Sequence, residues 1–244
     1  MEPKVYSYPF AGHKLYYAFR CPSARYLFRP LPVEEEPAER VISVTDEQFA
    51  LARSLLPEDA ADGYVEYRAL ILLSANALLR HGCCIFHAAS FLYRGRAWLL
   101  AAPSGTGKTT QYRNWETAHP GEITMISGDM PVLELREDGG VWVHPSPWNG
   151  KENIGNRISA PLGGVVYLRQ GKQNELSRPP VAELLTPVFR QFMARPETEE
   201  DARALGRLVD RMFSAYPVWQ FVNDGTPAST ELLRTAFTDC TESG

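Results

Sequence analysis

The sequence predicts an α/β protein with a small β-rich part at its N-terminus, and three features support this prediction. Short apolar segments rich in β-branched and aromatic residues alternate with longer segments of helical periodicity. One apolar segment runs into a glycine-containing loop and then into a helix-like segment, over residues 98–111. Strand-like segments dominate about the first 45 residues.

The composition fits an ordinary globular protein of one or two domains, at about 150 residues per domain. We divide the 244 residues into a β-rich subdomain, 1–60, and a larger domain, 61–244. The net charge of −4 argues against a nucleic-acid or anionic-membrane partner. No apolar run approaches the ~20 residues of a membrane span, and residues 1–12 do not resemble a signal peptide. We therefore expect a cytoplasmic protein.

The N-terminal part is expected to form a small sheet followed by helices. The expected strands, of which the first two would form a hairpin, are 4–10, 14–19, 25–29 and 40–44. Thr45, with Gln48 three residues later, resembles a capping box and predicts the start of a helix. A second helix is expected over 67–80, and Gly82 is expected to end it.

The remainder alternates between strands and helices. The expected strands are 83–93, 97–102, 123–127, a hairpin of 132–136 with 141–145, 163–169 and 217–222. The expected helices are 107–118, 181–194, 199–215 and a last one after Thr226 that runs through 237. The adjacent Cys83 and Cys84 match no metal spacing and are expected to be small apolar residues of a buried strand.

The loop "APSGTGKTT" (102–110) has the composition of a phosphate-binding loop between a strand and a helix. Gly105 and Gly107 allow positive φ, so that successive N–H groups can face phosphate oxygens. Lys108 can reach the β- and γ-phosphates, and the Thr109 hydroxyl suits Mg²⁺. The other predicted nucleotide contacts of the loop are Ser104, Thr106 and Thr110. A turn of small residues is the alternative, and the usual opening glycine is replaced by Ala102.

A carboxylate follows the next buried strand, in "ITMISGDMP". Asp129 lies just past the end of that strand, where a carboxylate can bind Mg²⁺ or accept a hydroxyl proton. The alternative is an exposed aspartate in a turn.

Three sequence blocks, of which the first contains the phosphate-binding loop, form a longer pattern: "FHAASFLYRGRAWLLAAPSGTGKTTQ", "ISGDMPVL" and "SPWNGKEN". In their order and spacing they resemble the catalytic domain of HPr kinase/phosphorylase and its shorter relatives, which are related to phosphoenolpyruvate carboxykinases. The resemblance covers about residues 85–237. It implies that the larger domain is a P-loop kinase-like catalytic domain, with a core of mixed β-sheet flanked by helices.

The resemblance also implies roles for single residues. Asp129 would be the base or a metal ligand, and His87 would lie beside the transferred phosphoryl group. Lys151 would neutralise phosphate charge and Glu152 would join the metal shell, whereas Trp148 would exclude water. Without the resemblance, His87 reads as a core histidine and the segment 148–153 as a solvated connection.

The sequence departs from the family at two points. The family shows two adjacent aspartates where this chain has Gly128 and Asp129. A further family segment, near "EIRGLGI", is missing. The acceptor is therefore left open.

We expect a Mg²⁺/ATP-dependent kinase that phosphorylates a serine-type hydroxyl on a protein, a peptide or a small metabolite. Two alternatives remain: a non-catalytic ATP-binding accessory or sensor, and a carboxykinase-like lyase that acts on an oxo-acid. The sequence leaves a homo-oligomer open.

Overall fold

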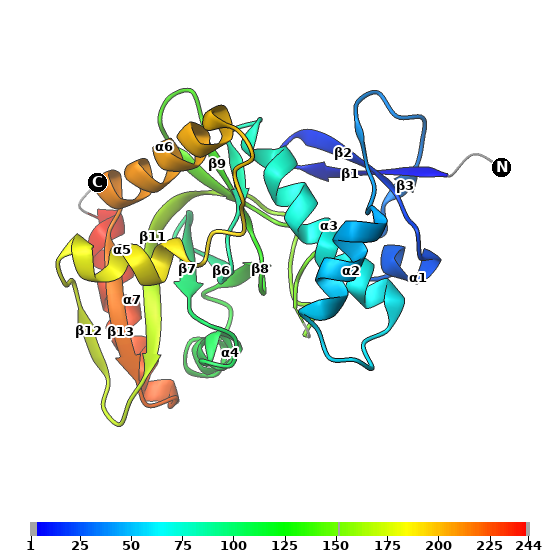
Figure 1. The fold of residues 1–244 in the computed structure, drawn as a ribbon. Coiled ribbons are helices and arrows are strands. Elements are labelled where there is room, and N and C mark those ends of the chain that lie inside the picture. Colours follow the sequence, from blue (N-terminus) through cyan, green and yellow to red (C-terminus); the bar gives the residue numbers. More distant parts are fainter. Residues whose placement is uncertain (1–3, 151, 243–244) are drawn as a thin grey trace.

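We describe the protein from a computed structural model, which covers residues 4–150 and 152–242. A large curled sheet carries helices on both faces, and a smaller lobe contains the N-terminal strands and three helices (Figure 1). The strands are β1 Val5–Phe10, β2 His13–Ala18, β3 Val33–Glu34, β4 Val41–Ile42, β5 Cys83–Ile85, β6 Ala88–Tyr93, β7 Arg96–Ala101, β8 Thr124–Ser127, β9 Val132–Leu135, β10 Val141–His144, β11 Ala160–Gln170, β12 Glu175–Ser177 and β13 Val218–Asn223. The helices are α1 Pro22–Arg25, α2 Asp46–Ser54, α3 Asp62–Leu79, α4 Lys108–Ala118, α5 Val181–Phe189, α6 Glu199–Ala215 and α7 Thr230–Glu242, the last preceded by a 3-10 turn at Pro227–Ser229.

The large sheet is mixed, as predicted. Its main path runs β5-β9-β10-β11-β7-β6-β8, and β13 pairs with both β11 and β12. β11 is parallel to β7 and to β13, whereas the remaining pairs of this sheet are antiparallel. At 11 residues, β11 is long enough to pair with β10 at its start and with β7 and β13 further along.

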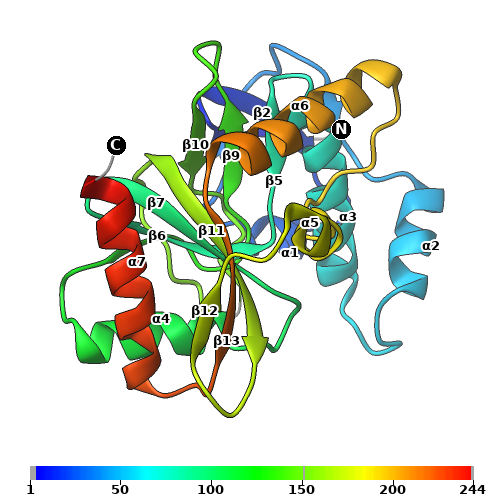
Figure 2. The ribbon, with the colours of Figure 1, turned by 90° about the vertical axis from the view of Figure 1, so that its left-hand side faces the viewer.

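The side chains of β7 alternate between the two faces of the sheet. Ala97, Leu99 and Ala101 belong to the core that includes buried residues of α5 and α6. Trp98 and Leu100 belong to the core that includes buried residues of α4 and α7. Figure 2 shows α4 and α7 on one side of the sheet and α5 and α6 on the other. β7 is therefore buried on both faces, which explains its continuous apolar run.

A third core joins the N-terminal lobe to the rest of the chain. Phe10 and Tyr17 of the β3-β1-β2-β4 sheet share it with Leu70 of α3, Val132 of β9 and Trp148. The predicted division at residue 60 therefore falls between segments that share one core, although the sheets on its two sides are separate. The predicted capping box at Thr45 is confirmed, since Thr45 and Gln48 exchange side-chain and backbone hydrogen bonds.

The predicted strand 25–29 is wrong. Helix α1 continues into turns, in which the amides of Tyr26, Leu27 and Phe28 bond to carbonyls three residues earlier. Phe28 is fully buried among the rings of Tyr17, Phe19 and Trp148. Tertiary packing of this ring thus overrides the β-propensity of the segment.

The single strand predicted over 83–93 is two strands. β5 pairs with β9, and β6 pairs with β7 and β8, so the chain changes partners at Phe86 and His87. The amide of His87 donates to the Gln191 carbonyl, and that of Ala88 donates to the Asp129 carbonyl. An unbroken apolar run cannot reveal where a strand changes partners, because both parts are buried.

Helix 181–194 is predicted too long, since α5 ends at Phe189. The segment after it joins β5, through a bridge between Phe86 and Phe192 and a bond from the Met193 amide to the Ile85 carbonyl. Within the described ranges, 4–150 and 152–242, no helix has both the length and the apolar character needed to cross a membrane.

Candidate active site

The phosphate-type loop lies between β7 and α4, as predicted. Gly105 has φ +82° and Gly107 has φ +110°, backbone angles that residues other than glycine rarely adopt. The Thr106 amide donates to the Pro103 carbonyl and the Gln111 amide to the Gly107 carbonyl. No acceptor among the described residues faces the other amides of this turn, those of Gly105, Gly107, Lys108, Thr109 and Thr110. The loop therefore offers several free donors at the N-terminus of an 11-residue helix, an arrangement that binds anions.

Lys108 begins α4 and turns its side chain under the loop. Its Nζ donates to the Ala102 carbonyl over 3.0 Å and to Nε2 of His87 over 3.1 Å. Burial lowers the pKa of Lys108, whereas the charge of Asp129 acts in the opposite direction. An anion on the loop would supply the missing counter-charge for this buried ammonium group.

His87 is held in one tautomer by Gln191. Nε2 of Gln191 donates to the Pro187 carbonyl, so Oε1 of Gln191 faces Nδ1 of His87 at 3.0 Å and can only accept. Nδ1 of His87 therefore carries the proton, and its Nε2 accepts from Lys108. Sequence reasoning missed Gln191, because the contact depends on the segment after α5 joining β5.

Asp129 follows β8 and completes the group. Its Oδ1 lies 3.3 Å from Nε2 of His87. The stretches 146–150 and 152–156 lie against this end of β8, through a bond from the Met130 amide to the Trp148 carbonyl and a bridge between Ser127 and Gly155. Lys108 and Asp129, predicted from a loop and a strand end, thus both contact the same imidazole nitrogen of His87.

The backbone carbonyls of Asn149 and Ile154 explain the glycine at position 128. A Cβ on Gly128 would lie 2.9 Å from the carbonyl oxygens of both Asn149 and Ile154. Gly150 packs on the other side of the site, since a Cβ there would lie 3.0 Å from Cβ of Asp129. A second aspartate cannot be accommodated at position 128 unless the backbone at Asn149 and Ile154 moves.

A cavity of about 700 Å³ opens in front of these groups. The predicted site residues that line it are Ser104, Gly105, Gly107, Lys108, Thr109, Thr110, Asp129 and Glu152. His87 lies behind Lys108 and Asp129. Thr106 instead turns back on the loop, where its hydroxyl donates to the Pro103 carbonyl. The predicted phosphate contact Lys151 lies outside the described residues.

The structure places Glu152 and Trp148 differently from what their predicted roles require. The carboxylate of Glu152 pairs with Arg113 of α4 at 2.5 Å. Within the part of the chain that the structure describes, no group of three or more His, Cys, Asp or Glu side chains could hold a metal ion. Trp148 does not line the cavity but is buried against Phe10 and Phe28. Its role is therefore to pack the core that carries the site.

The opposite wall of the cavity comes from residues that sequence reasoning did not select. They are Tyr26, Leu27 and Arg29 after α1, and Tyr64, Tyr67, Arg68 and Ile71 on α3. The signal for the second group was present, because 64, 67, 68 and 71 have the i, i+3, i+4, i+7 spacing of one helix face.

The sequence matches no protein-family model and no curated protein.

Proposed function

We propose that the protein is a Mg²⁺-dependent kinase that transfers the γ-phosphoryl group of ATP to a hydroxyl group. The observation that carries the proposal is the meeting of Lys108, His87 and Asp129, with contacts of 3.1 and 3.3 Å, beside a cavity that the phosphate-type loop lines. A phosphate-binding loop provides affinity for nucleotides of many classes. The adjacent carboxylate adds a group that can act on a phosphoryl acceptor.

The triphosphate fits the loop on chemical grounds. The free amides between Gly105 and Thr110 would donate to phosphate oxygens, as would the N-terminus of α4. Lys108 would exchange its bonds to Ala102 and His87 for bonds to phosphate, which also offsets the cost of its burial.

Mg²⁺ fits the cavity beside the loop, because it needs few ligands from the protein. This ion usually keeps several waters and takes one or two carboxylates together with the phosphates of the substrate. The Thr109 hydroxyl and the Asp129 carboxylate, which both line the cavity, would hold it. When bound, the ion neutralises phosphate charge. Glu152 is already paired with Arg113 and would take part only if that pair opened.

The transfer itself requires a base for the acceptor hydroxyl. Asp129 would accept the hydroxyl proton while the acceptor oxygen bonds to the γ-phosphorus and the bond from that phosphorus to the β,γ-bridging oxygen breaks. ADP leaves with the bridging oxygen. His87, fixed by Gln191, would keep Lys108 and Asp129 close to each other beside the reacting group.

A transfer assay tests the proposal. γ-Labelled ATP, Mg²⁺ and fractionated host extract are incubated with the wild type and with Lys108→Ala, and the labelled species is identified. We expect label on a hydroxyl of one component with the wild type only. Equal labelling by both proteins would contradict the proposal.

A second candidate function is a non-catalytic ATP-binding sensor. The observation that favours it is the close contact of Gly128 with the Asn149 and Ile154 carbonyls, which fills the space of a second carboxylate. Tight MgATP binding by the pure protein, with no transfer in any extract fraction, would favour the sensor over the kinase.

A further inference from the structure

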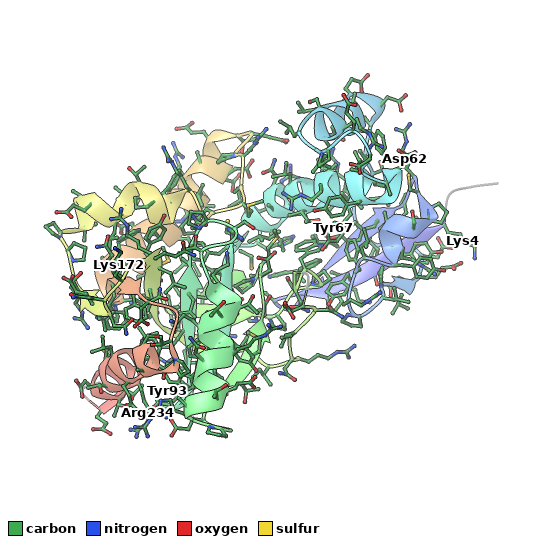
Figure 3. All side chains as sticks on the ribbon, turned by 90° about the horizontal axis from the view of Figure 1, so that it is seen from below. Lys4, Asp62, Tyr67, Tyr93, Lys172 and Arg234 are labelled. Atoms are coloured by element: carbon green, nitrogen blue, oxygen red, sulfur yellow. The ribbon has the colours of Figure 1, made fainter. Side chains whose placement is uncertain are left out.

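The cavity has a second wall that the phosphate loop does not explain. Tyr64, Tyr67 and Arg68 lie on one face of α3 and line the cavity opposite the loop. The rings of Tyr64 and Tyr67 are stacked, with centroids 6.1 Å apart. Figure 3 shows Tyr67 on the flank of α3 opposite α2. Tyr26 and Arg29, from the segment after α1, complete the wall. We call these five residues the acceptor wall.

The acceptor wall is positively charged. Among the described residues, no carboxylate forms an ion pair with Arg68 or Arg29, although Arg29 donates to the Phe28 carbonyl. The only acidic side chains on the described lining of the cavity are Asp129 and Glu152, and the second is paired with Arg113. Two guanidinium groups therefore face the cavity without a counter-charge, which favours an oxyanion ligand.

Asp129 lies between the loop and the acceptor wall. It contacts His87 at 3.3 Å on the side of the loop. Asp129 and Tyr67 both line the cavity, and the pKa of the Tyr67 hydroxyl is raised first by burial and then by the charge of Asp129. A hydroxyl that reaches Asp129 must therefore place its own substituents against the acceptor wall.

The two halves of the wall are fixed to each other by a buried carboxylate. Glu66 of α3 is fully buried and accepts from the amides of Arg20 and Cys21, at 2.7 and 2.6 Å. These amides directly precede α1, so the chain that leads to Tyr26 and Arg29 is tied to α3. The wall is thus preorganised for a ligand rather than formed by two independent loops.

We propose that the acceptor is a hydroxyl compound that carries a carboxylate, which Arg68 and Arg29 bind while Tyr64 and Tyr26 pack on its apolar part. This inference rests on the proposed kinase function. A singly charged carboxylate is favoured over a phosphate, because a dianion beside the triphosphate would add more repulsion. The carboxylate could belong to a small hydroxy acid or to an acidic side chain beside a serine in a peptide, and both present the same chemistry to the wall.

Matched ligands test the inference without turnover. N-acetylserine and N-acetylserinamide differ only in that a carboxylate is replaced by an amide. The same holds for the N-acetylated, C-amidated dipeptides Asp-Ser and Asn-Ser. Their affinities are measured by ligand-observed NMR titration, with and without Mg²⁺ and a non-hydrolysable ATP analogue. We expect the wild type to bind the acidic member of at least one pair about tenfold more tightly, as is typical of a charge-assisted bond. The pair that shows the difference identifies the source of the carboxylate.

Variants assign the difference to the wall. Arg68→Gln should reduce the preference to less than about threefold, and Arg203→Gln should leave it unchanged, because Arg203 pairs with Glu199 within α6. Arg29→Gln, on an exposed segment, repeats the test if Arg68→Gln lowers the melting temperature. No preference in either pair, or a preference that survives both wall variants, would overturn the inference.

Binding of the ATP analogue distinguishes a failure of the acceptor wall from a failure of the kinase proposal. If the ATP analogue binds and neither pair shows a preference, the acceptor wall is wrong and the nucleotide site stands. If the preference is present and the analogue does not bind, the wall stands as an anion site and the kinase proposal fails. If Arg68→Gln weakens the analogue as much as the carboxylate, the wall holds the nucleotide, which also overturns the inference.

Discussion

Nζ of Lys108 lies 3.1 Å from Nε2 of His87, and this contact joins the first turn of α4 to the break between β5 and β6. The same imidazole nitrogen lies 3.3 Å from Oδ1 of Asp129. It therefore stands between a buried ammonium group and a carboxylate. With Nδ1 of His87 protonated toward Gln191, Nε2 has one lone pair and can satisfy only Lys108. Movement of Lys108 to a phosphate would free this lone pair.

Asp129→Asn is expected to slow phosphoryl transfer by about 100-fold or more, because the amide cannot accept the acceptor proton. The dissociation constant of MgATP should change by less than about threefold. Single-turnover transfer and calorimetric binding measure the two quantities. Asp138→Asn, in the exposed β9–β10 turn, is the matched control, since its side chain can still accept from the Gly140 amide. Equal losses in rate and in affinity would leave Asp129 only its role in holding Mg²⁺ and would contradict its role as the base.

Gln191→Leu is expected to lower the transfer rate by about five- to tenfold, the equivalent of one hydrogen bond of about 1 kcal/mol. The reason is that Nδ1 of His87 loses its acceptor, so the ring is free to change tautomer and turn. The affinity for MgATP should stay the same, and the pH profile of the rate should shift. Gln191→Glu, which keeps an acceptor, should restore most of the rate. A fall in affinity with an unshifted profile would reduce Gln191 to a packing role.

Gly128→Ala is expected to lower the free energy of unfolding by roughly 1–3 kcal/mol, the usual cost of overpacking. The added methyl group would meet the backbone carbonyls of Asn149 and Ile154 at 2.9 Å, and backbone atoms cannot give way as the end of a flexible side chain can. Gly206→Ala in α6 is the matched control, because a Cβ there has no neighbour within 4 Å. This control should gain about 0.5–1 kcal/mol from helix propensity. Urea unfolding measures both, and a neutral Gly128→Ala would contradict the described packing.

His144 is expected to make the fold less stable as the pH falls below neutrality. Burial lowers the pKa of His144, against the opposing effect of Glu134, at 2.9 Å from its Nε2. As the pH falls below about 6.5, the His144 imidazole is therefore protonated in the unfolded chain before it is protonated in the folded protein. The free energy of unfolding decreases as the pH falls further. One proton limits the slope to about 1.4 kcal/mol per pH unit. Between pH 7.5 and 5.5 the wild type should lose more unfolding free energy than His144→Gln, whereas parallel curves would contradict the prediction.

Local patterns predicted much of the fold. The capping box at Thr45, the strand β7 before the loop and the hairpin of β9 and β10 depend on neighbouring residues, and the sequence reveals such features directly. The break at His87 and the turns through Phe28 depend on partners far along the chain, namely Gln191 and Trp148. No local pattern carries that information.

The candidate site divides in the same way. The loop glycines, Lys108 and Asp129 were found because a strand end followed by polar residues is a local signal. Arg68 and Tyr64 were missed because the face of α3 that lines the cavity is decided by how the N-terminal lobe packs on the large sheet. The pairing of Glu152 with Arg113 likewise required the position of α4.

We propose that the loop between β7 and α4 holds the triphosphate of ATP, and calorimetric titration of the protein with ATP and Mg²⁺ is the decisive test. We expect one nucleotide per chain for the wild type and an affinity at least about tenfold weaker for Lys108→Ala, since a charge-assisted bond is lost. Lys172→Ala, which lies far from Tyr67 in Figure 3, should bind like the wild type. No binding by the folded wild type, or equal binding by Lys108→Ala, would contradict the claim.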